Sequence, residues 1–146
     1  MPTQQHENFR NIDVVEVVSN HGFDSVQKIE FVKIGNIVPF SDGLPDIHVV
    51  LETMNNGSLC ACNFHTMMEL VMPNSSLIVD ERAEHLLFIG GALIRNSRRF
   101  IPSLRETYTV HRCSGKKIPV KTWFPALIPE SDVFHRMWTK RIAVFH

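Results

Sequence analysis

The sequence has few of the features that mark membrane-spanning or exported proteins. No apolar run approaches the roughly 18 residues needed to span a bilayer. The polar segment 1–13 lacks the apolar region of a secretory signal. Cysteine is scarce: Cys60, Cys62 and Cys113 cannot all pair internally and are too few for a disulfide framework. We therefore expect an intracellular protein with reduced thiols, soluble or peripheral to a membrane.

Motifs of common enzymes are also missing. The chain has no Gly-x-Ser-x-Gly, no P-loop and no Gly-x-Gly-x-x-Gly. Gly90-Gly91 lies inside a helical pattern rather than after a strand, and this position does not suit a phosphate-binding loop. The close crossing of another element would explain two glycines at this position. We therefore expect a non-enzymatic protein, and the sequence indicates no catalytic residue, no cofactor and no small-molecule substrate.

What is present is an ordinary globular composition. The 146 residues are 44% hydrophobic and 21% charged, far from the composition of disordered chains. This length suits one domain. We predict a flexible amino terminus at 1–11 and a single small α+β domain at 12–146, with an antiparallel β-sheet packed against one or two helices.

The first half of the chain predicts strands, hairpins and one short helix. Segments 12–18 and 26–34 are rich in Val, Ile and Phe and flank Asn20-His21-Gly22, which predicts a β-hairpin with Ile29 and Phe31 facing inward. A loop is predicted at Pro39 to Pro45, around Ser41-Asp42-Gly43.

A second hairpin is predicted next. Segment 47–54 reads as a strand, Asn55-Asn56-Gly57 as its turn and 58–62 as its short partner. Segment 63–72 then predicts a helix that Pro73 ends.

A longer helix is predicted at 80–96, where apolar residues recur at helical spacing. Asp80 would cap its amino end, and arginines would lie at its negative pole. Beyond it, 104–113 and 118–124 predict strands joined by a turn at 114–116. Segment 133–145 fits either a helix, through Trp138, Ile142 and Phe145, or a strand, and we favour a strand for its end at 142–145.

The net charge of zero hides an asymmetry between the two halves of the chain. Residues 1–73 hold three Lys/Arg against nine Asp/Glu, for a net charge of −6, and residues 74–146 hold twelve against six, for +6. From Arg95 onward, eleven basic residues accompany three acidic ones. Complementary charges on one small body favour head-to-tail association between copies. A homo-oligomer is therefore expected.

The basic residues of the last third are interleaved with aromatic residues, a mixture that suits phosphates of nucleic acid or of anionic lipids. The alternative interpretation is that the aromatic residues belong to the core and the cations to a solvated face. The predicted anion-binding residues are Arg95, Arg98, Arg99, Lys116, Lys117, Lys121, Arg136, Lys140 and Arg141.

A different class of function would use the cysteines. Cys60, Cys62, His65 and Cys113 offer ligands for Zn²⁺, or a thiol beside a histidine base, as in a small metal-binding protein or enzyme. The Cys-x-Cys spacing differs from the Cys-x₂-Cys of compact zinc modules. Cys60 and Cys62 would otherwise serve as small core residues.

The order of predicted elements over 47–112 resembles the core of rhabdovirus matrix proteins. The residues that carry this are 47–54, Asn55-Asn56-Gly57, 65–72, 85–94 and 104–110, read as strand, turn, helix, second helix and Arg-bearing aromatic strand. The chain lacks that family's basic amino-terminal arm and its Pro-Pro-x-Tyr motif.

The resemblance implies a viral structural protein of the virion that self-associates and bridges nucleocapsid and membrane. Any membrane attraction would then come from the basic C-terminal third. The alternative from another class is a nucleic-acid-binding accessory protein.

Overall fold

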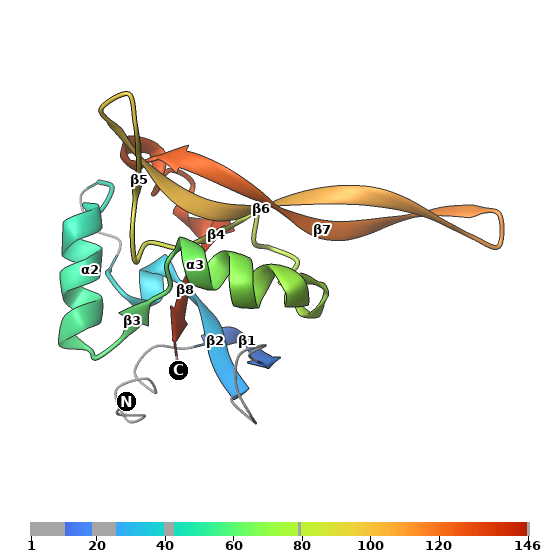
Figure 1. The fold of residues 1–146 in the computed structure, drawn as a ribbon, viewed down its shortest axis with the longest axis horizontal. Helices are drawn as coiled ribbons and strands as arrows, with labels where there is room; N and C mark the ends of the chain where they lie inside the picture. Colours follow the sequence, from blue (N-terminus) through green and yellow to red (C-terminus); the bar gives the residue numbers. More distant parts are fainter. Residues whose placement is uncertain (1–10, 19–25, 40–42, 79, 146) are drawn as a thin grey trace.

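The computed structural model describes residues 11–18, 26–39, 43–78 and 80–145. It shows an α+β fold in which an eight-stranded sheet carries helices on both faces (Figure 1). The strands are β1 (Asn11–Val18), β2 (Val26–Lys33), β3 (Cys60–Ala61), β4 (His85–Leu87), β5 (Leu93–Arg95), β6 (Arg98–Cys113), β7 (Lys116–Pro129) and β8 (Lys140–Phe145). The helical segments are η1 (Ile34–Asn36), α2 (Ile47–Asn56), α3 (Phe64–Thr66), η2 (Met67–Val71), η3 (Met72–Leu77), η4 (Glu130–Asp132) and η5 (Met137–Thr139).

The strand order is β1-β2-β8-β4-β6-β5, with β3 also paired to β8 and β7 to β6. All of these pairs are antiparallel except β4 and β8, which run parallel. The α+β class is therefore confirmed, and the sheet is mixed rather than wholly antiparallel. No helix in the described part of the chain has the length and apolar character that crossing a membrane requires.

Two cores lie on opposite faces of the sheet, because successive side chains of a strand point to opposite sides. On β8, Ile142 and Val144 pack with the buried side of α2, whereas Ala143 packs with Met67 and Val71 of η2. The inward orientation predicted for the second strand is confirmed, since Ile29 and Phe31 are both fully buried.

The strand predicted at 47–54 is wrong, because this segment is helix α2. Asp46 caps it by accepting a hydrogen bond from the backbone N–H of His48 at 2.7 Å. Ile47, Val50 and Met54 are buried at helical spacing against the sheet. Asn55-Asn56-Gly57 therefore ends a helix rather than turning a hairpin, and the partner of β3 is β8.

The helix predicted at 80–96 is also wrong, because the segment forms a turn followed by β4 and β5. Asp80 does accept backbone N–H groups, those of Arg82 and Ala83, but only within a local turn. The apolar run from Leu86 to Ile89 is buried at every position, as suits a central strand covered on both faces.

The remaining predicted elements are confirmed, with changed bounds. The hairpin of β1 and β2, a helical segment after Asn63, the strands β6 and β7, and the final strand β8 are all present. The predicted turn at Asn20-His21-Gly22, residues 1–10 of the predicted flexible terminus, and Ser41-Asp42 lie outside the described residues. Asn11, the last residue assigned to that terminus, is the first residue of β1.

Candidate anion-binding surface

Strands β6 and β7 form a long hairpin that projects from the body of the molecule (Figure 1). Its last pair is Cys113 opposite Lys116, and the turn between them consists of Ser114 and Gly115. Both turn residues have positive φ, 55° and 77°, which a type I′ turn requires. The turn predicted at this position is therefore confirmed, and it makes a tight tip.

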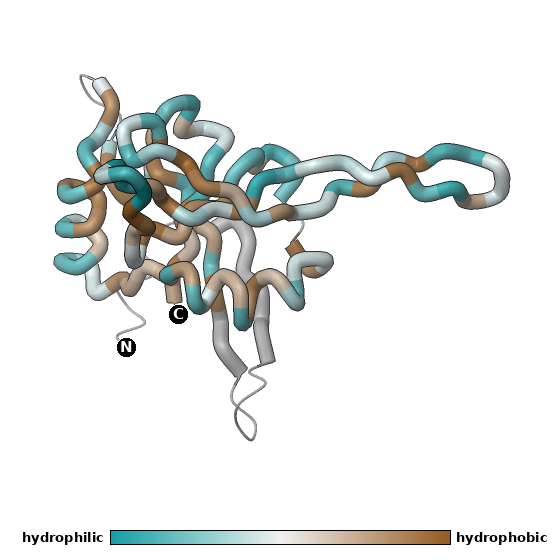
Figure 2. The backbone as a smooth tube through the Cα atoms, turned by 45° about the horizontal axis from the view of Figure 1, so that its top comes forward, coloured by the Kyte–Doolittle hydropathy of each residue, from teal (hydrophilic) through white to brown (hydrophobic). Residues whose placement is uncertain are grey.

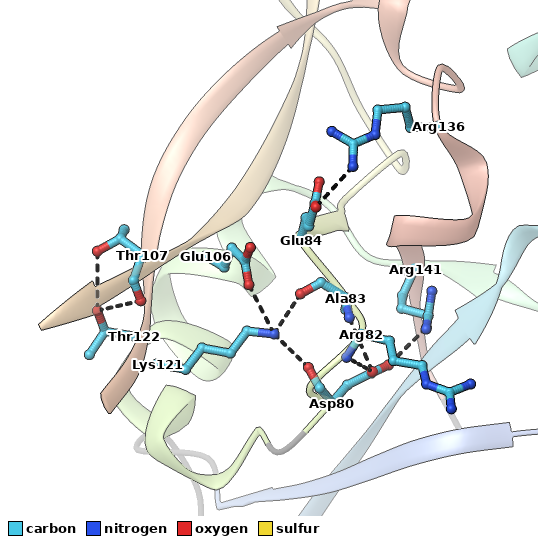
Figure 3. A network of polar contacts seen from close by, with 10 residues as sticks. All are labelled: Asp80, Arg82, Ala83, Glu84, Glu106, Thr107, Lys121, Thr122, Arg136 and Arg141. Atoms are coloured by element: carbon cyan, nitrogen blue, oxygen red, sulfur yellow. Dashed lines mark hydrogen bonds and ion pairs between the residues drawn. The ribbon is translucent and has the colours of Figure 1, made fainter. Parts of the chain in front are cut away.

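Lys121 fastens the root of this hairpin to the body (Figure 3). Its Nζ donates hydrogen bonds to the backbone oxygens of Asp80 at 2.7 Å and Ala83 at 2.6 Å. The same atom lies 3.2 Å from the carboxylate of Glu106 and 4.8 Å from the ring centroid of the buried Trp123. Lys121 is thus committed to the structure and not to a partner, contrary to its predicted role.

Beyond this root lies the part that we call the distal arm, residues 108–120. Every residue from Val110 to Val120 is exposed, and the arm contains no Asp or Glu. Its cations Arg112, Lys116 and Lys117 surround the turn. Figure 2 shows hydrophobic and hydrophilic residues alternating along it. The distal arm is therefore a two-stranded ribbon with a positively charged tip.

Large apolar side chains on the distal arm are also exposed. Tyr108 and Val110 are 58% and 61% exposed, and Ile118 and Val120 are exposed on the partner strand. A lone two-stranded ribbon is marginally stable in water, and such side chains are usually covered by a partner. The distal arm thus combines positive charge with an apolar contact surface.

A second basic tip lies where β5 turns into β6. Arg95 pairs with Arg98 across a two-residue turn, and both are exposed. Arg99 is ion-paired, with its Nε 2.7 Å from the Glu130 carboxylate. Arg95 and Arg98, in contrast, form no ion pair within the described residues, so they remain available to an anion.

The third predicted group, near the carboxyl end, faces the interior or is paired. Arg136 is ion-paired with Glu84 at 3.1 Å. Lys140 is buried, and its Nζ donates to the backbone oxygen of Asp132 at 3.2 Å. Burial lowers the pKa of Lys140. Arg141, 1% exposed, is ion-paired with a carboxylate at 2.8 Å. Lys140 and Arg141 therefore do not belong to an exposed anion-binding face.

Arg141 and Asp80 form the only fully buried ion pair within the described residues (Figure 3). The arginine Nε lies 2.8 Å from Asp80 Oδ2, while Nη1 donates to the backbone oxygens of Trp138 and Lys140. The pair links the turn after residue 79 to β8, and buried charges need this kind of pairing.

The exposed cations of the two basic tips lie at opposite ends of one strand. β6 begins at the Arg98 tip and ends at the distal arm, and its 16 residues span roughly 50 Å at 3.3 Å per residue. No small anion can contact both ends. An extended polyanion, or two separate partners, would be required.

The cysteines and His65 do not form a site. Cys60 is exposed on β3, Cys62 is fully buried, and Cys113 lies at the tip of the projecting hairpin. Burial raises the pKa of the Cys62 thiol, which makes it a poor nucleophile or ligand. Within the described ranges, no group of three or more His, Cys, Asp or Glu is placed to hold a metal ion.

Two features of the distal arm were not among the predicted site residues. Arg112 lies directly opposite Lys117 in the hairpin register, so the tip has one more cation than expected. The exposed Val110 opposite Pro119 is the other feature. The available signal was the absence of acidic residues between Thr107 and Thr122.

Comparison with protein-family models, with curated proteins and with solved structures gives no match for this chain. The pattern resemblance to rhabdovirus matrix proteins used five elements. Three of these differ from the structure that the resemblance assumes: 47–54 is helical, Asn55-Asn56-Gly57 ends that helix, and 85–94 contains strands instead of a helix. The exposed arm and the basic tips are therefore the features of the molecule that indicate a function.

Proposed function

We propose that the protein is a non-enzymatic, matrix-like structural protein that binds an anionic polymer through its distal arm and associates with further copies of itself. The distal arm carries the proposal: it projects from the body, has three cations at its tip and contains no acidic residue. The divided charge of the chain supports the association between copies.

Nucleic acid, as in a nucleocapsid, suits the distal arm better than a bilayer does. The apolar side chains of Val110 and Ile118 lie nearer the root than the cations of Arg112 and Lys117. Insertion of the tip into a bilayer would carry the charges into hydrocarbon first, which costs about 3 kcal/mol for each Lys or Arg. Phosphates along a strand can instead contact the cations while a base stacks on Tyr108.

The test compares the wild type with the variant Arg112→Gln/Lys116→Gln/Lys117→Gln. Binding to a 30-nucleotide uridine RNA is measured by fluorescence anisotropy at 50 to 300 mM NaCl. We expect the variant to bind at least tenfold more weakly at low salt. The slope of log K against log salt should fall by about 2, because each phosphate contact to a single strand contributes about 0.7.

The matched control is Arg99→Gln/Arg105→Gln/Arg136→Gln, which removes the same charge from the body of the molecule. Equal losses in both variants would mean that net charge, not the distal arm, attracts RNA, and would contradict the proposal. Flotation with vesicles of 70% phosphatidylcholine and 30% phosphatidylserine tests the membrane alternative. Arm-dependent vesicle binding without RNA binding would replace nucleic acid with a membrane surface.

The second candidate is a nucleic-acid-binding accessory protein, favoured by the basic ribbon alone. It differs in predicting a monomer. A chain that binds RNA through the distal arm, yet stays monomeric in sedimentation velocity at 20 mM NaCl, would support this second candidate.

A further inference from the structure

A cavity of about 540 Å³ lies away from the distal arm, where the end of β2, η1, the turn after residue 79 and η5 meet β8. This volume is within the range of small-molecule sites. No acidic residue lines it, whereas three cations do. Its lining residues are Lys33, Ile34, Gly35, Asn36, Arg82, Met137, Trp138 and Arg141.

The cations of this cavity are gathered by the fold from distant parts of the chain. Lys33 lies opposite Arg141 in the register of β2 and β8. Arg82 is brought to them by the turn in which its N–H donates to Asp80 Oδ1 at 3.0 Å. Figure 3 shows Arg82 and Arg141 beside Asp80, with the Arg141 side chain directed toward the Asp80 carboxylate. Asp80 neutralises one charge, so a net positive charge remains.

Two of these cations are free to bind a ligand. Lys33 and Arg82 are exposed and form no ion pair within the described part of the chain. Arg141 is buried and already holds Asp80 and two backbone oxygens, which fixes its position at the cavity. Its Nη2 donates to none of the described residues. The cavity therefore offers two exposed, unpaired cations among the described residues and one cation that is fixed by its contacts.

Trp138 supplies a flat aromatic surface at the same cavity. It is 69% exposed, more than any other large hydrophobic residue among those described. The backbone oxygen of Trp138 accepts a hydrogen bond from Arg141 Nη1 at 3.0 Å, which ties its backbone to the cationic group. Ile34 and Met137 add apolar lining beside it. An exposed tryptophan beside cations is the combination that holds a base and its phosphate.

We propose that this cavity binds a nucleoside phosphate, with the base stacked on Trp138 and the phosphate held by Lys33 and Arg82. Two sources share this chemistry: a free nucleotide, and one nucleotide of an RNA strand. The site is separate from the distal arm, so the proposal does not depend on the function proposed above.

The test uses ATP and a 12-nucleotide adenosine RNA as probes, with intrinsic tryptophan fluorescence and isothermal titration calorimetry on the full chain. Trp123 is buried, so quenching on binding reports on Trp138. We expect Trp138→Ala to weaken binding about tenfold, matching a stacking contribution of 1–3 kcal/mol per base. Trp138→Phe should retain most of the affinity.

The role of the two phosphate-binding cations is tested by the variant Lys33→Gln/Arg82→Gln. The matched control is Arg95→Gln/Arg98→Gln, which removes two exposed cations elsewhere. For ATP, only the first pair should weaken binding, again about tenfold. Quenching of Trp138 by ATP but not by the RNA identifies a free nucleotide, and quenching by both identifies a nucleotide of a strand.

Three results would overturn the proposal: no binding of either probe at millimolar concentration, equal affinity of Trp138→Ala and wild type, or inorganic phosphate competing as well as ATP. The arm variant Arg112→Gln/Lys116→Gln/Lys117→Gln should keep full ATP binding. RNA binding measured by anisotropy tests the distal arm, and ATP binding tests the cavity. If that variant loses RNA binding but keeps ATP binding, the two sites are independent, so one proposal can fail without the other.

Discussion

At the scale of single residues, the buried pair of Asp80 and Arg141 is the strongest polar constraint. Asp80→Asn keeps an oxygen for the backbone N–H groups but places an amide donor against the Arg141 Nε donor. We expect a loss of about 3–5 kcal/mol in unfolding free energy, because a buried charge is left without its counterion. Urea unfolding followed by circular dichroism measures this loss.

The control for this prediction is Glu130→Gln, which breaks the exposed pair with Arg99. Exposed pairs contribute about 1 kcal/mol or less. If Asp80→Asn were no more destabilising than Glu130→Gln, the buried pair would not be a stability determinant.

The unfolding free energy should depend on pH because of Glu30. It is fully buried, and burial raises its pKa from 4.5 to about 8. Between these values the folded chain binds a proton that the unfolded chain releases, so stability falls as pH rises toward 8. Glu30→Gln is neutral throughout and should lose this dependence.

Thermal unfolding from pH 6.5 to pH 8.5 checks this expectation. The midpoint of the wild type should decrease across the range relative to that of Glu30→Gln. The range begins at pH 6.5 because the lowered pKa of the half-buried His85 affects stability below that value. Parallel midpoints for the two proteins would contradict a raised pKa at Glu30.

At the scale of elements, Gly90 sets how closely the loop after β4 approaches β3. Its N–H donates to the backbone oxygen of Cys62 at 2.9 Å, and an added Cβ would lie 2.6 Å from the oxygen of Ala61. The close crossing expected for the glycine pair is therefore confirmed at Gly90, although the segment is not a helix. We expect Gly90→Ala to cost about 1–3 kcal/mol, as overpacking does.

Gly91→Ala is the matched control, since its added Cβ would meet its nearest neighbour, Asn63 Cβ, at 3.9 Å. It should change the unfolding free energy by about 0.5 kcal/mol or less. Equal effects of the two substitutions in urea unfolding would mean that the approach of β3 does not constrain the loop.

At the scale of the whole molecule, the projecting basic hairpin and the acidic first half predict self-association that salt weakens. Sedimentation velocity at 20 mM and 500 mM NaCl should show larger species at low salt and the monomer at high salt. The variant Arg112→Gln/Lys116→Gln/Lys117→Gln should stay monomeric at both. A wild type that is monomeric at both salt concentrations would exclude charge-driven assembly.

The sequence by itself determined the distal arm. Ser114-Gly115, two alternating strands and cations without acidic neighbours are local signals, and local signals suffice for a tight hairpin. It was less informative at 47–54 and 80–96. In the first segment β-branched residues obscured a helical period, and in the second a cap-like Asp80 and apolar spacing fitted a helix although burial on both faces of the sheet required a strand.

Only the tertiary structure decided which cations are exposed and which are buried or paired. Lys121, Lys140 and Arg141 are basic residues like any others in the sequence. Contacts between separate elements bring them to carboxylates and backbone oxygens of the folded chain. The cavity beside Trp138 arises in the same way, because Lys33 and Arg82 approach it from segments far apart in the chain. Side-chain environments of this kind depend on packing between elements, which the local pattern of residues does not specify.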